Sequence, residues 1–341
     1  MRGEGRQGEW GLYGWFSGLM LCGSCFGAVA WWADMQVLVL GFNLNNNPAS
    51  STLTIAQAYS IVAQSPRWVA AFVVTYAMEF LCLSAAKLMV LDRMMEFAMR
   101  KGEGVWRRWV VGGRAVMAAV VAGNAVGLGG NIAAAVYFQR SGESFSAASA
   151  AFAANNTADA NNFVNLGVQQ NQLAGSTQSL QSFCEVAVLL LIIVAFAVVG
   201  AACTRRINSA LLDTNFAPAA AAGKQLRLRI VGTAAFVFVT FLLRAVYSTM
   251  FALGNKLQNA GNYVNCPGSN QCDASCYNVY TLMQTWLLYT PEFQLMVVMI
   301  SSPLALLVAL LGMTTDRALR QMQSNRRQMG ATRDALLQGT G

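Results

Sequence analysis

The sequence predicts an all-α fold: a polytopic transmembrane helical bundle of about six spans, with both termini in the cytoplasm and a small helical cap outside. Three observations lead to this prediction. The 341 residues are 55% hydrophobic and only 11% charged, whereas soluble proteins carry about 25% charged residues. Six segments reach the length of about 20 residues that crosses a hydrocarbon core, and the basic residues lie in alternate loops. The six segments are 13–42, 68–91, 109–138, 183–203, 230–253 and 293–313.

The distribution of positive charge orients the bundle. Most Lys and Arg residues lie in the loops between spans two and three and between spans four and five, and in the C-terminal tail, while the other loops hold only Arg67, Arg140 and Lys256. Loops rich in Lys and Arg remain in the cytoplasm. The net charge of +8 is therefore explained by topology and by contact with the lipid bilayer. We expect no nucleic-acid partner, because the chain has no folded basic module.

The predicted organisation is a transmembrane bundle over 1–316 followed by a basic cytoplasmic tail over 317–341. Two outer segments belong to the bundle, at about 139–182 and at about 255–290. The first is rich in alanine, which favours helix, so we expect spans three and four to continue outward as an antiparallel helical hairpin that turns near 155–162. Leu166, Leu173 and Leu180 are spaced by seven residues, as in a coiled coil. A disordered polar loop is the alternative.

Pairs of glycines four residues apart occur in spans one and three. Small residues at this spacing let helix backbones approach closely in lipid. We therefore expect spans one and three to be interior helices packed within the chain, with a homo-oligomer or a membrane partner bound through the same faces as the alternative. The pairs are Gly14 with Gly18, Gly23 with Gly27, and Gly123 with Gly127.

A signal peptide is an alternative interpretation of span one. The small residues Ala28-Val29-Ala30 resemble a cleavage site after an apolar run. Apolar residues continue over 35–42, however, and this favours an uncleaved membrane anchor.

Cysteines and a glycosylation sequon fall on the side predicted to be outside. Cys184, Cys266, Cys272 and Cys276 are disulfide candidates there, because disulfides persist in oxidising compartments, and four cysteines allow three pairings. Free thiols are the alternative, and zinc is disfavoured because the chain has no histidine. Asn155 begins an Asn-Asn-Thr sequon. These features predict a glycoprotein of the plasma membrane or of an endomembrane of the secretory pathway.

Four polar residues within or beside the spans are candidates for a ligand site or an ion pathway. Glu79 and Arg244 lie deep in spans two and five, where ionisable groups usually face a partner or water. Asn124 and Glu185 lie at comparable depth. The alternative is a buried structural ion pair, which fixes helix register without binding a ligand. We expect Lys87, near the inner interface, to extend its amine to water.

No motif for enzymatic chemistry is found, so the sequence predicts that the chain is not an enzyme and that it needs no cofactor or metal. Without histidine it lacks the usual proton shuttle and metal ligand. The favoured function is a receptor-like, sensing bundle with a disulfide-stapled cap. A channel or transporter subunit and a membrane scaffold or assembly protein are the alternatives. The order of the loops resembles helices two to seven of a seven-helix receptor, with Asp92-Arg93 at the place of the acid–arginine pair of such receptors.

Overall fold

The computed structural model describes residues 4–46, 53–98, 105–212 and 238–253, together with the single positions 228, 232, 235, 236, 282, 283 and 286. Spans one to four lie within this part of the chain, and so does most of span five. Span six, the loop cysteines Cys266, Cys272 and Cys276, and the tail lie outside it.

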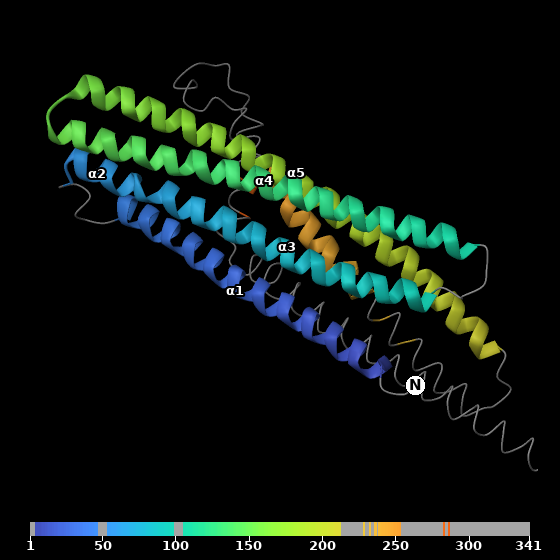
Figure 1. Ribbon diagram of the computed structural model, residues 1–341. Helices are drawn as coiled ribbons and strands as arrows, with labels where there is room; N and C mark the ends of the chain where they lie inside the picture. Colours follow the sequence, from blue (N-terminus) through green and yellow to red (C-terminus); the bar gives the residue numbers. More distant parts are fainter. Residues whose placement is uncertain are drawn as a thin grey trace, which may run out of the picture.

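The described chain is entirely helical (Figure 1). Its helices are α1 (Glu4–Asn46), α2 (Ile55–Val62), α3 (Gln64–Ala98), α4 (Val105–Ala153) and α5 (Thr157–Leu212), followed by the apolar helical segment Phe238–Leu253. Four helices of the described part, α1, α3, α4 and α5, are long and apolar enough to cross a membrane. These findings confirm an all-helical fold, with long apolar helices that suit a membrane-embedded protein. The prediction of six spans with cytoplasmic termini stays a prediction.

The longest helices extend far beyond a bilayer. At about 1.5 Å per residue, the 49 residues of α4 and the 56 residues of α5 exceed by more than twofold the length that spans a core of about 30 Å. Apart from the turn at 154–156, residues 139–182 are helical, and α4 and α5 form an antiparallel hairpin there (Figure 1). This stretch is therefore helix and not a disordered loop. The side of the membrane on which the hairpin lies stays a prediction.

Residues 154–156 form the hairpin turn, at the start of the predicted range. The N–H of Asn156 donates to the carbonyl of Ala151, and the N–H of Asn155 donates to that of Phe152, which is the Schellman arrangement that ends many helices. Asn155 has φ of 60°, and asparagine tolerates this left-handed conformation better than most residues. The Asn156 side chain then caps α5, because its Oδ1 accepts from the N–H of Asp159 at 3.2 Å.

The α4–α5 seam consists mainly of small residues. Its buried positions on α4 are Ala134, Phe138, Ser141, Phe145 and Ala148, and on α5 Ala160, Gly167, Ala174 and Gln181. The seam continues toward the membrane at Gly123, Gly127 and Gly130, where an added Cβ would lie 3.3 Å or less from α5 atoms. Such spacing lets two helices approach closely.

The leucine heptad lies one residue out of register with this seam. Leu166, Leu173 and Leu180 are exposed, whereas the following residues Gly167, Ala174 and Gln181 are buried. The seven-residue spacing is present, but the buried positions of α5 in the seam are the residues that follow each leucine, so the leucines are not the centre of the hairpin interface.

The first helix is peripheral and not interior as predicted. One face packs on α3, where a Cβ at Gly23 would meet Cys82 at 3.3 Å and a Cβ at Gly27 would meet Glu79 at 3.0 Å. Much of the remaining surface of α1 is exposed, and no atom of the described residues lies within 4 Å of a Cβ at Gly14 or Gly18. The helix α1 is continuous through residues 28–30, the stretch that resembles a signal-peptide cleavage site.

The short helix α2 supports the hairpin from the side of α4. Thr54 and Gln57 form a capping box at its start. Tyr59 stacks on Phe145 and Phe152 with ring centroids 6.3 and 5.2 Å apart, and Ser149 donates to the carbonyl of Ala56 at 2.6 Å. The hairpin is therefore braced by α2 over much of its α4 side.

We predict that the hairpin tip carries a glycan. Asn155 is exposed at the turn, so a transferase on the lumenal side reaches it. The protein expressed in eukaryotic cells should shift in mobility on glycosidase treatment, and the shift should disappear in Asn155→Gln and in Thr157→Ala. The second variant removes the sequon without touching the left-handed residue. A native chain that shows no shift would contradict the predicted topology.

Candidate functional site

The centre of the site is a buried ion pair between α5 and the segment Phe238–Leu253. Arg244 Nε lies 3.4 Å from Glu185 Oε1, and the side chain of each residue is only 2% exposed. Sequence analysis named both residues as candidates, and the structure brings them together. Glu185 follows the start of the most apolar stretch of α5, so the pair lies toward the hairpin side of the bundle.

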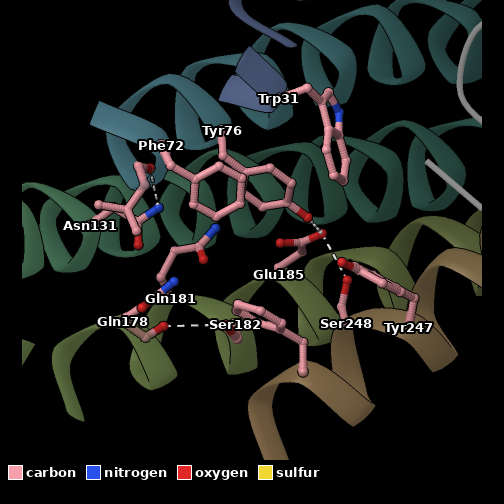
Figure 2. A pocket seen from close by; sticks show the side chains of 12 residues that line it. Trp31, Phe72, Tyr76, Asn131, Gln178, Gln181, Ser182, Glu185, Tyr247 and Ser248 are labelled. Atoms are coloured by element: carbon pink, nitrogen blue, oxygen red, sulfur yellow. Dashed lines mark hydrogen bonds between the residues drawn. The ribbon is translucent and has the colours of Figure 1, made fainter. Parts of the chain in front are cut away.

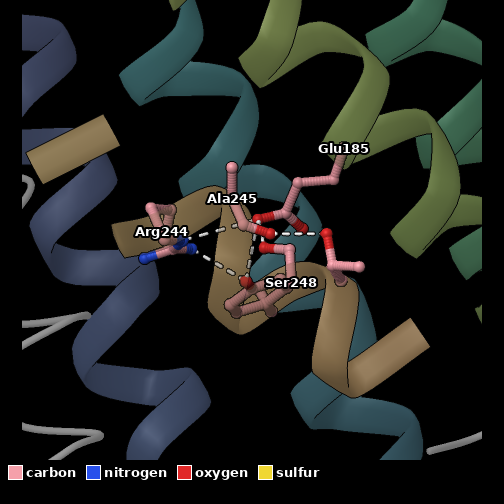
Figure 3. Close-up of polar contacts among 6 residues, drawn as sticks. Glu185, Arg244, Ala245 and Ser248 are labelled. Atoms are coloured by element: carbon pink, nitrogen blue, oxygen red, sulfur yellow. Dashed lines mark hydrogen bonds and ion pairs between the residues drawn. The ribbon is translucent and has the colours of Figure 1, made fainter. Parts of the chain in front are cut away.

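Two further side chains complete this network. Ser248 Oγ donates to Glu185 Oε1 at 2.9 Å, and Tyr76 Oη, from α3, donates to the same oxygen at 3.1 Å. Tyr76 Oη in turn accepts from Arg244 Nη2 at 2.8 Å. Figure 3 shows Arg244 and Ser248 extending from one helix toward Glu185 on another. One carboxylate oxygen thereby joins three helical elements, α3, α5 and Phe238–Leu253.

A small cavity lies beside the network (Figure 2). Its volume is about 20 Å³, and polar lining comes from Asn131, Gln178, Gln181, Ser182 and Glu185. A single water needs about 10–15 Å³ of such volume and two to four polar partners. Asn131 donates to the carbonyl of Val73 at 2.7 Å, while its Oδ1 has no hydrogen-bond partner. The cavity therefore suits one ordered water rather than an organic ligand, which needs about 300 Å³ or more.

Glu79 lies apart from this network. It is 7% exposed, and its carboxylate faces α1, where a Cβ on Gly27 would lie 3.0 to 3.2 Å from the carboxyl atoms. Its Oε2 has no hydrogen-bond partner. Gly27 is thus the residue that lets α1 pack over a buried acid, and the structure does not place Glu79 in hydrogen-bond contact with Arg244.

Asn124 lines a second cavity of about 10 Å³ on the other side of Glu185, together with Gly123, Gly127 and Gln181. Its Oδ1 has no hydrogen-bond partner. Of the four predicted residues, the structure therefore pairs two, Glu185 and Arg244. Asn124 is adjacent to Glu185 through this cavity, and Glu79 faces another helix.

The expectation for Lys87 is wrong. Its side chain does not extend to water but is 2% exposed. The amine lies 4.5 Å from the ring centroid of Phe241 and 6.0 Å from that of Phe80, within the range of a cation–π contact. The reason is that the segment Phe238–Leu253 covers this face of α3, which the sequence of α3 alone does not reveal.

Among the described cysteines the structure contains no disulfide. Cys184 is a free thiol that faces Gly127 of α4, with 3.6 Å between its Cβ and a Cβ built on that glycine. Its three predicted partners lie outside the described residues, so the disulfide-stapled cap stays a prediction.

Sequence reasoning missed Tyr76 and Ser248. For each residue, a feature of the sequence could have indicated that it belongs to the site. Ser248 is four residues after Arg244 and so lies on the same helix face, and a tyrosine within a span normally needs a partner for its hydroxyl group. Tyr76 also supplies an aromatic face for Arg244, whose guanidinium carbon lies 5.4 Å from the ring centroid.

The fold and the site define a class: a membrane-embedded helical bundle with a buried charge network and a long helical hairpin. Comparison with known proteins adds no narrower assignment, because no family model, curated protein or solved structure matches this chain.

We predict that the buried pair behaves as a unit in stability. Glu185→Leu or Arg244→Leu alone leaves a buried charge without its partner, which costs about 3–5 kcal/mol, whereas the double variant removes both charges and should recover most of this loss. Thermal unfolding of the purified protein in one detergent measures the effect. Exposed Glu143 provides the control, because Glu143→Leu should change little. Additive losses in the double variant would show that the two residues act independently.

Proposed function

We propose that this protein is a membrane scaffold or assembly protein, which anchors a long helical hairpin in the bilayer and presents it to a protein partner. The observation that carries the proposal is an apolar stripe on the hairpin. It consists of Phe163, Leu166, Leu173 and Leu180 of α5, which are 37, 43, 45 and 50% exposed.

The stripe lies where the chain is otherwise polar. Residues 157–182 are mostly alanine, asparagine, glutamine, serine and threonine, and they precede the apolar stretch of α5 that suits lipid. Large apolar side chains grouped on a polar surface typically mark an interaction site. The buried seam of the hairpin lies one residue further along, at Gly167, Ala174 and Gln181. The exposed part of the stripe is therefore not used by the hairpin interface, and binding to a partner explains it better.

The receptor and channel interpretations need more space than the described residues enclose at the charge network. A receptor needs a ligand pocket and a channel needs a polar pathway, whereas the two cavities that the described residues line there measure about 20 and 10 Å³. In the proposed function the network has a structural role instead. It joins three helical elements around Glu185 and so keeps the base of the hairpin fixed, and the proposal assigns the chain no catalysis. A membrane of the secretory pathway is the location that the sequon and the charge distribution favour.

The proposal predicts a complex that depends on the stripe. In a mild detergent, the native chain should elute with a mass greater than one chain, as measured by size exclusion with light scattering. Leu166→Gln with Leu173→Gln should release a single chain. Because both leucines are exposed, these substitutions should change the stability of the monomer by no more than about 0.5 kcal/mol.

The matched control substitutes the exposed neighbours that precede each leucine, as Asn165→Gln with Gln172→Asn, and should leave the complex intact. A native chain that is monomeric under these conditions, or a leucine variant that retains the larger mass, would refute the assembly function.

A further inference from the structure

We propose that the partner bound by the stripe is a second copy of this chain, and that the two α5 helices pair in parallel and in register. This inference rests on the proposed function and identifies its partner. Three features of α5 support it: the spacing of the exposed face, the orientation that a membrane imposes, and the absence of charge along the hairpin.

The exposed face repeats every seven residues, as one core position of a parallel coiled coil does, and it extends beyond the hairpin. Leu166, Leu173 and Leu180 are followed at the same interval by Ala187 and Val194, both exposed. A strict seven-residue repeat keeps one face in contact with a partner helix through a left-handed supercoil. The face therefore continues from the hairpin into the apolar stretch of α5, where the small Ala187 permits close approach.

The membrane fixes the relative orientation of two copies. Both insert with the same topology, so their α5 helices run in the same direction and place identical residues at the same depth. The twofold axis of such a dimer lies along the membrane normal, and each residue on the axis faces its own copy. Leu173 then packs against Leu173 of the other chain, and the leucines above and below follow in register.

In-register pairing brings like residues together, which penalises any charge at the interface. Residues 160–184 contain no Asp, Glu, Lys or Arg, so a second copy meets no like charge along 25 residues. Because this stretch carries no charge, it also cannot select a different partner by charge complementarity. An identical helix is therefore the occupant that this face fits best.

The test is disulfide cross-linking in native membranes. Leu173→Cys, treated with a mild oxidant, should yield a product of twice the chain mass several-fold more than Gln172→Cys. Gln172 is also exposed but points about 100° away around the helix. Leu180→Cys should repeat the result at a second position, and the unsubstituted chain corrects for the native cysteines.

Each outcome decides between the proposals. A dimer specific to Leu173→Cys and Leu180→Cys supports the second copy. A specific product that contains another protein overturns this inference and leaves the assembly function standing. Equal yields at Leu173 and Gln172 indicate random collision and overturn the dimer. If neither position cross-links to anything, both the dimer and the assembly function fail.

Discussion

The close approach of α4 and α5 is the constraint on which the rest of the structure depends. It requires glycine at particular positions of α4: a Cβ on Gly130 would lie 3.3 Å from the carbonyl oxygen of Thr177, and one on Gly123 would lie 2.7 Å from the side chain of Val188. The register of α4 against α5 follows from this close approach. That register sets the position of the three-residue turn and of the seam, and it leaves the leucine stripe exposed.

The charge network acts at the base of this hairpin. Glu185 lies directly after the hairpin stretch of α5, and its carboxylate accepts hydrogen bonds from three donors on α3 and Phe238–Leu253. A buried ion pair adds little net stability compared with an apolar packing, but it specifies which helices meet and at what register. We therefore regard the pair as the element that ties the hairpin to the rest of the bundle.

Sequence analysis predicted the helical class, the hairpin stretch and the two residues of the ion pair, because apolar length, alanine content and charges in an apolar span are local signals. It could not assign contacts that depend on a neighbouring helix. Lys87 was misjudged because Phe241 covers it, and Glu79 faces Gly27 of α1 rather than Arg244. The seven-residue spacing of Leu166, Leu173 and Leu180 was noted, but the sequence pattern alone could not tell whether these leucines face their own chain or a partner.

The central claim is the register of α4 on α5, and one cross-link measures it most directly. Ser144 Oγ lies 3.0 Å from Gln170 Oε1 across the hairpin, so Ser144→Cys with Gln170→Cys should form an intrachain disulfide rapidly in membranes. Ser144→Cys with Gln172→Cys should not, because Gln172 is exposed on another face of α5. Mass spectrometry of the digested chain identifies the bond. A Ser144–Gln170 pair that stays reduced, or a Ser144–Gln172 pair that oxidises equally fast, would contradict the register from which the stripe and its function are derived.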